Sequence, residues 1–180
     1  MPGSGRQTVP LFFEICHDET KYLQQRKVFI DTNEDEEINW KTNINEANAC
    51  VEVINDLISL YTLNGKTILE DSIGIITPYR AQIALIRKCM EQLPPEIFKK
   101  ITVDTVERYQ GGARDIVIIS FCVNKLAQLD SLVSLSSEGV DRKLNVALTR
   151  AKEQIILIGN DELLSANNVY KKLIDSYKEK

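Results

Sequence analysis

The feature that most constrains the fold is the apolar run at residues 115–122, which reads Asp-Ile-Val-Ile-Ile-Ser-Phe-Cys. A strand with one face in water alternates apolar and polar residues, whereas this run predicts a strand that is buried on both faces. Shorter apolar runs at 27–31, 72–77 and 101–104 are separated by segments with helical periodicity or by loops. Buried strands that alternate with helices are typical of a parallel sheet covered by helices. We therefore expect an α/β domain.

The predicted helices have recognisable starts and ends. Asn43, followed three residues later by Glu46, resembles a capping box that opens a helix reaching Tyr61. A second helix is predicted to begin near Tyr79 and to end at Pro94, because proline does not continue a helix. Residues 161–180 predict a closing helix, and the polar, Ser-rich stretch 123–139 predicts a surface excursion.

The length of 180 residues is that of one domain with a real core. We expect residues 1–26 to be a leader and a poorly patterned segment, with 1–5 flexible, and residues 27–180 to form the domain. No apolar run approaches membrane-spanning length and no signal peptide is recognisable, so we expect no membrane partner. The four cysteines lie far apart, which predicts a reducing, intracellular setting, either cytoplasmic or nuclear.

The composition excludes several kinds of catalytic site. His17 is the only histidine, so a zinc site or a Ser/His/Asp relay lacks the residues it needs, and we expect no metal ligands in this chain. The formal net charge of −4 disfavours a dedicated nucleic-acid-binding domain. The charges are uneven, however, and local sign matters more than the sum. An acidic block occupies 34–37, and six basic residues gather later: Arg108, Arg114, Arg142, Lys143, Arg150 and Lys152.

Two stretches follow predicted strands, where open parallel sheets bind their ligands. In the stretch 77–82, Arg80 falls in the first turn of a helix, where a cation opposes the helix dipole, so we expect it to bind a phosphate. The alternative is an arginine that simply extends to water. The stretch 103–115 combines Thr105, Gln110 and two glycines, which allow a phosphate or sugar to approach the backbone closely. Its alternative is an ordinary glycine turn before a buried strand.

A third stretch, residues 142–160, predicts a basic helix that turns at once into an apolar strand. The helix would carry a narrow apolar stripe with a polar edge on each side. The stripe is Leu144, Ala147, Leu148 and Ala151; one edge is Asn145, Thr149 and Lys152, and the other is Lys143 and Arg150. A solvated basic helix is the alternative, but it leaves the ordered Asn, Thr and Arg unexplained.

One apparent phosphate loop is rejected. Gly65, Lys66 and Thr67 match the end of that motif, but Leu60 stands where its first glycine belongs, and a helix precedes it in place of a strand. We interpret these residues as the end of the helix and the loop after it.

Together, the stretches 74–82, 104–111 and 144–152 resemble motifs IV, V and VI of superfamily 1 helicases. The branch they resemble most contains the nonsense-mediated-decay helicase and senataxin, and the resemblance runs from about residue 28 to 160. It implies a RecA-like three-layer sandwich, which is a P-loop NTPase fold without its own P-loop. It also implies a C-terminal motor domain that closes over ATP and Mg²⁺ held by an N-terminal RecA-like domain of the same polypeptide, and that moves along single-stranded DNA or RNA, 5′ to 3′.

The resemblance also implies roles for particular residues. Tyr79 would stack on the adenine, while Arg80 and Arg150 would reach the γ-phosphate as arginine fingers. Thr105 would contact the nucleic-acid backbone, and Gln110 with Gly111 would link that contact to the nucleotide. Asn145 and Thr149 would hold their helix against the turn near Thr105.

This chain departs from the helicase pattern at one position. The family commonly reads Gln-Gly-Arg-Glu-Lys-Asp where residues 110–115 read Gln-Gly-Gly-Ala-Arg-Asp. The family's Glu is expected to hold the ribose, and the Ala113 side chain cannot accept a hydrogen bond.

Two other functions compete with a motor half. One is a non-catalytic interaction module that keeps the RecA-like fold, against which Arg80 and Arg150 speak. The other is a self-contained nucleotide-binding enzyme, which lacks support because no glycine-rich loop follows the first strand.

Overall fold

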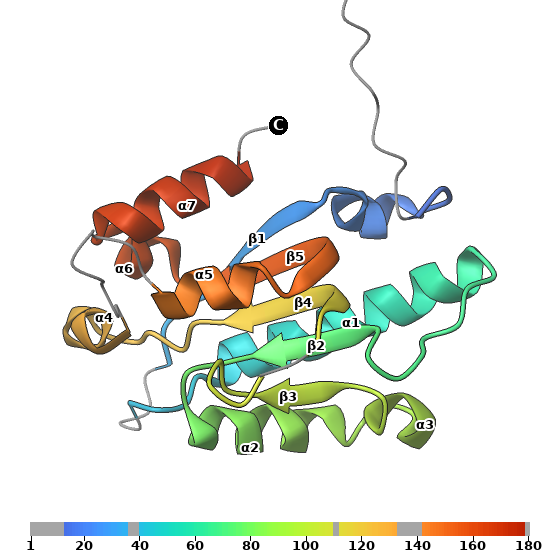
Figure 1. The fold of residues 1–180 in the computed structure, drawn as a ribbon, viewed down its shortest axis with the longest axis horizontal. Coiled ribbons are helices and arrows are strands. Elements are labelled where there is room, and N and C mark those ends of the chain that lie inside the picture. The colour runs from blue at the N-terminus through green and yellow to red at the C-terminus, as the bar shows by residue number, and fades with distance from the viewer. Residues whose placement is uncertain (1–12, 36–39, 110–111, 133–141, 179–180) are drawn as a thin grey trace, which may run out of the picture.

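A computed structural model of the chain describes residues 13–35, 40–109, 112–132 and 142–178. Its centre is a five-stranded sheet with the order β1-β5-β4-β2-β3, in which every pair of neighbours is parallel (Figure 1). The strands are β1 (Lys27–Asp31), β2 (Ile73–Ile76), β3 (Thr102–Asp104), β4 (Arg114–Ser120) and β5 (Ala151–Gly159). The predicted parallel α/β sheet is confirmed.

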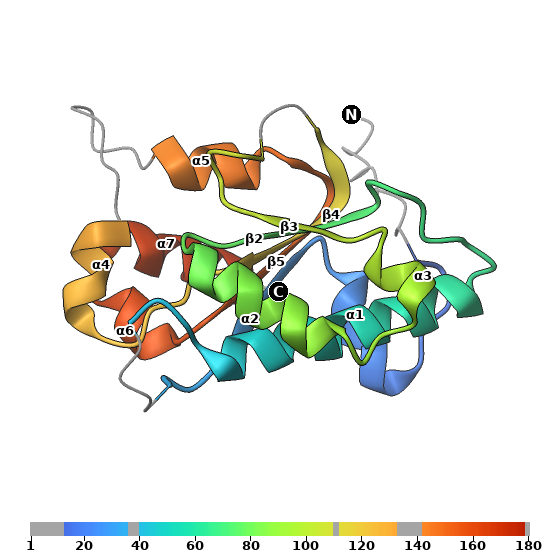
Figure 2. The ribbon, with the colours of Figure 1, turned by 90° about the horizontal axis from the view of Figure 1, so that it is seen from below.

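Helices cover both faces of the sheet and form the three layers expected of a RecA-like domain (Figure 2). One face carries the 3₁₀ helix η1 (Asp18–Gln24) with α1 (Ile44–Leu63), α2 (Arg80–Met90) and α3 (Pro95–Phe98). The other face carries α5 (Arg142–Leu148) and α7 (Asn168–Lys178). The short helices α4 (Leu126–Leu132) and α6 (Asp161–Ser165) lie toward the carboxyl ends of the strands (Figure 1).

Strand β4 explains why the apolar run is continuous. Ile116 and Ile118 point into the core beneath α1 and α2, whereas Val117 and Ile119 point into the core beneath α5 and α7. All four side chains are at most 4% exposed. A strand between two cores needs apolar residues at successive positions, since no position faces water.

The segment before β1 contributes to the same core. Phe13 is fully buried and packs edge-on against Tyr61 of α1, with ring centroids 5.3 Å apart. Leu23 of η1 is also buried in that core. The main chain at Glu14 and Ile15 donates two hydrogen bonds to the Asn64 side chain, which fastens the segment to the end of α1.

The boundary between helix and strand in the third stretch differs from the prediction. Helix α5 ends at Leu148, and β5 already begins at Ala151, so Ala151 and Lys152 belong to the strand and not to the helix. The reason is tertiary: the start of β5 is paired with β4, where Arg114 is level with Ala151, and β1 joins on the other side from Ile155 onward. Backbone pairing with β4 outweighs the helical pattern of this short segment.

The remaining helix predictions hold with smaller changes. The closing helix is divided into α6 and α7, since the Asn167 side chain accepts the Val169 N–H at the break. The described part of the excursion 123–139 contains α4. Gly65 lies beyond the Asn64 cap of α1 with φ of 63°, so the rejected phosphate loop is the helix end that we predicted. Within the described residues, no helix combines the length and apolar character needed to cross a membrane.

Candidate nucleotide and nucleic-acid sites

The predicted site residues divide between two opposite ends of the sheet. Tyr79 and Arg80 follow the carboxyl end of β2, and Thr105 follows that of β3. Arg150 instead immediately precedes the amino end of β5. Ile76, at the end of β2, is level with Leu157 through Ile119, and β5 rises about 20 Å from Ala151 to Leu157 at roughly 3.3 Å per residue. The structure therefore does not bring Arg80 and Arg150 together.

A cavity of about 140 Å³ opens at the carboxyl end, between α5 and the last residues of β2 and β4. Its lining includes Thr77, Tyr79, Glu107, Ser120, Lys143 and Ala147. The Thr77 hydroxyl is buried and has no hydrogen-bond partner in the described part of the chain. Leaving a buried hydroxyl unpaired costs roughly 1–3 kcal/mol, so this atom fits a ligand that brings an acceptor or donor.

Tyr79 and Arg80 are held differently at this end. Tyr79 is half-buried, and burial raises the pKa of its hydroxyl while a hydrogen bond with the Gln128 side chain lowers it. Arg80 is exposed as the first residue of α2. Its charge therefore opposes the dipole of α2, as predicted.

Glu46 lies at the centre of a buried polar cluster beneath this end of the sheet. Asn43 Oδ1 accepts the Glu46 N–H at 2.8 Å, as a helix cap should. The Glu46 carboxylate does not complete the predicted capping box; it accepts the Ser120 hydroxyl at 2.6 Å and the Cys122 N–H at 2.8 Å. Burial raises the pKa of Glu46 to about 7, although these hydrogen bonds lower it.

Gln82 closes this cluster into a ring. Its Oε1 accepts the Asn43 N–H at 2.8 Å, and its Nε2 donates to the Asn43 carbonyl at 3.0 Å and to the Ser120 hydroxyl at 3.3 Å. The ring ties the start of α1, the end of β4 and the first turn of α2 to one another. Sequence reasoning missed it, although one signal was available: Gln82 is polar yet shares a helical face with Ile86.

Arg150 occupies the turn between α5 and β5 at the amino end of the sheet. Its carbonyl accepts the Arg114 N–H at 2.8 Å, which fastens the turn to β4. Its Nε atom is buried and finds no hydrogen-bond partner among the described residues. A partly buried guanidinium with an unused donor fits a phosphate oxygen supplied from outside the domain.

The segment after Thr105 crosses the sheet toward the same end. The Tyr109 ring lies against Gly74 of β2, and the Arg114 guanidinium lies 5.2 Å from the ring centre. Arg114 also forms an ion pair of 2.8 Å with Asp71. Burial raises the pKa of Tyr109 to about 12, which Arg114 opposes. This segment thus connects the carboxyl end of β3 to the amino end of β4.

The other predicted residues, Asn145 and Thr149, were expected to hold α5 against the turn after Thr105. Helix α5 meets the turn after Thr105 through an ion pair of 2.8 Å between Lys143 and Glu107. Asn145 is exposed, and the Thr149 hydroxyl donates to the Val146 carbonyl of its own helix. Neither makes the predicted contact with the turn in the hydrogen bonds of the described chain.

Two further predictions concern the pair Gln110 and Gly111 and the absence of metal ligands. Gln110 and Gly111 lie outside the described residues. Among the residues that are described, no three His, Cys, Asp or Glu side chains are grouped to hold a metal ion.

Comparison with known proteins gives consistent similarities. A family model described as an AAA domain matches residues 7–162. Regulator of nonsense transcripts 1 from Dictyostelium discoideum is 32% identical over 174 residues, which is 95% of this chain and 11% of that protein. Helicase sen1 from Schizosaccharomyces pombe is 29% identical over 90% of this chain and 9% of its own length.

A plant protein and a solved structure add to these similarities. The DNA replication ATP-dependent helicase/nuclease JHS1 from Arabidopsis thaliana is 32% identical over 84% of this chain and 11% of its own length. The chain therefore spans about a tenth of the length of these relatives. The C-terminal domain of a possible DNA helicase from a Lactobacillus covers 81% of this chain and 83% of its own, with 15% identity and a TM-score of 0.46.

Proposed function

Since this chain belongs to the superfamily 1 helicases, as their second RecA-like domain, we propose that it is the C-terminal motor half of an ATP-dependent DNA or RNA helicase or translocase. It would act with an N-terminal RecA-like domain of the same polypeptide. That domain would hold ATP and Mg²⁺ with a phosphate loop, which this sequence does not contain.

The observation that carries the proposal is Arg150, which is half-buried at the turn between α5 and β5 and whose Nε has no hydrogen-bond partner among the described residues. An arginine finger stabilises the charge that spreads over the phosphoryl oxygens during transfer, and in related NTPases it is worth roughly 10³ to 10⁵ in rate. The hydrogen bond from Arg114 to the Arg150 carbonyl holds the backbone of the finger in place. Arg150 would thus complete a site whose other half lies on the partner domain.

The carboxyl end of the sheet would bind the nucleic-acid strand. Thr77 and Lys143 line the cavity between α5 and the strand ends, as do Val106 and Glu107, which directly follow Thr105. Hydroxyl and lysine contacts to phosphates position a strand without reading its bases. Tyr79 and Arg80, for which the helicase resemblance implies contacts with the adenine and the γ-phosphate of ATP, lie at this same end. Because Arg150 lies at the other end, Arg80 would contact a phosphate of the strand in place of the γ-phosphate. Gln110 and Gly111 would lie along the segment that joins the two ends.

Replacement of Arg150 tests the finger. In the complete polypeptide, Arg150→Ala should lower the nucleic-acid-stimulated kcat for ATP at least 10³-fold while ATP binding stays within about threefold. The matched control is Lys152→Ala, because Lys152 is a neighbouring cation with a side chain that is 56% exposed. It should keep a kcat close to that of the wild type. Phosphate release measures turnover, and a fluorescent nucleotide measures binding.

The same assay separates the motor from its competitors. The 180-residue chain alone should release no phosphate, because it has no phosphate loop. Full turnover by Arg150→Ala would overturn the finger, and a complete polypeptide that never hydrolyses ATP would support a non-catalytic interaction module. Turnover by the isolated chain would instead support a self-contained enzyme.

A further inference from the structure

Trp40, the only tryptophan of the chain, is exposed at the carboxyl end of the sheet. It occupies the turn before α1, and 49% of its surface is accessible to water. Tryptophan is rarely fully buried, but an indole this exposed gains little from folding. Neither the ATP site nor the cavity beside α5 uses it.

The turn that carries Trp40 is held by side chains of the segment at α4. The Gln128 amide donates a hydrogen bond to the Trp40 carbonyl. Asn124 Nδ2 donates to the Thr42 carbonyl at 2.7 Å, and Asn124 Oδ1 accepts the Asn43 amide at 2.6 Å. The backbone beneath the indole is therefore fixed, so that a ligand stacked on the ring would not have to order it.

A lysine ammonium lies close to the Trp40 ring. The Lys125 Nζ atom lies over the ring, 5.4 Å from its centre, and Lys41 is the next residue after Trp40. The acidic block 34–37 comes shortly before Trp40 in the chain. Within it, Asp35 is buried and its carboxylate accepts the Ile44 N–H, whereas Glu34 is exposed.

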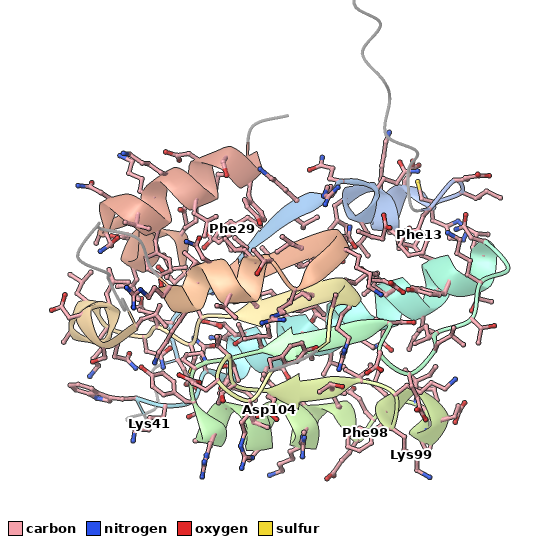
Figure 3. The ribbon with its side chains drawn as sticks, in the orientation of Figure 1. Phe13, Phe29, Lys41, Phe98, Lys99 and Asp104 are labelled. Carbon is pink, nitrogen blue, oxygen red and sulfur yellow. The ribbon has the colours of Figure 1, made fainter. Side chains whose placement is uncertain are left out.

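Trp40 is also continuous with the proposed nucleic-acid site. Gln128, which binds the Trp40 carbonyl, also forms the hydrogen bond that lowers the pKa of Tyr79. Tyr79 in turn lines the cavity that contains Thr77. Figure 3 labels Lys41 at the edge toward which the strand arrows point, the edge at which Asp104 ends β3. A strand that leaves the cavity past Tyr79 would therefore meet the indole.

We propose that Trp40 is a stacking platform for one base of a single-stranded nucleic acid, with Lys125 beside it for a phosphate. This inference rests on the proposed function and extends its nucleic-acid site beyond the three helicase motifs. An aromatic face combined with nearby cations is the general means by which proteins bind single strands without reading sequence.

The sole tryptophan allows stacking to be observed directly. The 180-residue chain is titrated with an end-labelled oligothymidylate and, in parallel, with an abasic oligonucleotide of the same length. Label anisotropy measures binding, and the intrinsic fluorescence of Trp40 measures stacking. Oligothymidylate should quench the fluorescence, and the abasic strand should leave it unchanged because it offers phosphates without bases.

Variants complete the test. Trp40→Ala should raise the Kd for oligothymidylate about tenfold, and Trp40→Phe should stay within about threefold of the wild type, since a phenyl ring still stacks. The control is Leu69→Ala, because Leu69 is an exposed apolar residue at the opposite end of the sheet, 62% accessible. It should bind like the wild type.

The outcomes separate this inference from the proposed function. If oligothymidylate binds the wild type and Trp40→Ala equally and causes no quenching, the platform is overturned while nucleic-acid binding stands; the surface would then suit a protein partner. If the wild type binds neither strand, the nucleic-acid part of the proposed function fails and this inference fails with it.

Discussion

At the scale of single residues, Gly74 shows how one missing side chain shapes the domain. A Cβ atom at this position would lie 1.4 Å from the Tyr109 hydroxyl and 2.6 Å from Cζ of the same ring. Only glycine leaves room for the tip of the Tyr109 ring against β2. Tyr109 belongs to the segment that joins the carboxyl end of β3 to the amino end of β4. The glycine in an otherwise apolar strand therefore makes room for this segment where it crosses the sheet.

We expect Gly74→Ala to lower the free energy of unfolding by about 3 kcal/mol, because the buried Tyr109 ring has to move. Urea unfolding measures the loss. The control is Gly65→Ala, since a Cβ there meets nothing within 4 Å and only the φ of 63° opposes it. That variant should lose about 1 kcal/mol.

A second measurement tests whether Tyr109 is the cause. On a Tyr109→Ala background, adding Gly74→Ala should cost less than about 1 kcal/mol, because residues in contact are not additive. An unchanged cost on that background would show that the strain arises elsewhere in β2.

At the scale of elements, the ring of Asn43, Glu46, Gln82 and Ser120 decides how three elements meet. It joins the cap of α1 to the first turn of α2 and to the end of β4. Tyr79 and Arg80 lie just before Gln82 in the chain, separated from it by Ala81, so the hydrogen-bond ring also sets where those two residues stand. A buried carboxyl at its centre makes the junction sensitive to protonation.

The pKa of Glu46 predicts the pH dependence of this junction. Burial raises that pKa to about 7 in the folded protein, above the ordinary value of 4.5. The folded state therefore holds the proton more tightly than the unfolded state, so stability from this group is present below pH 4.5 and is lost as the pH rises to about 7. Glu46→Gln does not titrate. As the pH rises from 4.5 to about 7, the unfolding free energy of Glu46→Gln minus that of the wild type should therefore increase by roughly 3 kcal/mol.

A neighbouring variant checks the assignment of this effect. The Ser120 hydroxyl donates to the Glu46 carboxylate and lowers its pKa. Ser120→Ala should therefore shift the pH dependence upward. Urea unfolding at a series of pH values records all three proteins, and parallel curves for Glu46→Gln and the wild type would refute the role of Glu46.

At the scale of the whole molecule, the proposed function uses the two opposite ends of the sheet. Strand β4 runs from Arg114, beside Arg150, to Ser120. Ser120 lies beside the cavity and belongs to the buried hydrogen-bond ring around Glu46. Its side chains are packed between two cores. A close-packed strand resists deformation, so a shift imposed at one end is carried to the other.

This arrangement predicts that replacing Arg80 and replacing Arg150 have different effects on the ATPase activity. In the complete polypeptide, Arg80→Ala should raise the nucleic-acid concentration for half-maximal ATPase stimulation about fivefold, since one phosphate contact is lost, and should leave the saturated kcat within about twofold. Arg150→Ala should lower the saturated kcat and leave the nucleic-acid concentration for half-maximal stimulation close to that of the wild type. ATPase titrations with a single strand measure both quantities.

The control for Arg80 is Lys88→Ala, a cation near the far end of the same helix, which should change neither quantity. If Arg80→Ala instead abolished kcat at saturating nucleic acid, Arg80 would be the second finger that the helicase resemblance implies. The partner domain would then have to bring the nucleotide to both ends of the sheet.

The sequence by itself determined the class of fold and the order of its elements. The run 115–122 required burial on both faces, which only a covered parallel sheet offers, and Asn43 marked the first residue of α1 within one position. These signals are local, since burial pattern and capping depend on residues that are neighbours in the chain. The three helicase motifs were recognisable for the same reason.

Only the tertiary structure decided how the motifs are distributed in space. The helicase resemblance implies that Arg80 and Arg150 share one phosphate, and strand direction places the two residues at opposite ends of the sheet. The end of α5 was set by pairing of β5 with β4, and Glu46 found a partner 74 residues away at Ser120. Contacts between residues far apart in the chain leave no local pattern, because only the packed sheet brings them together.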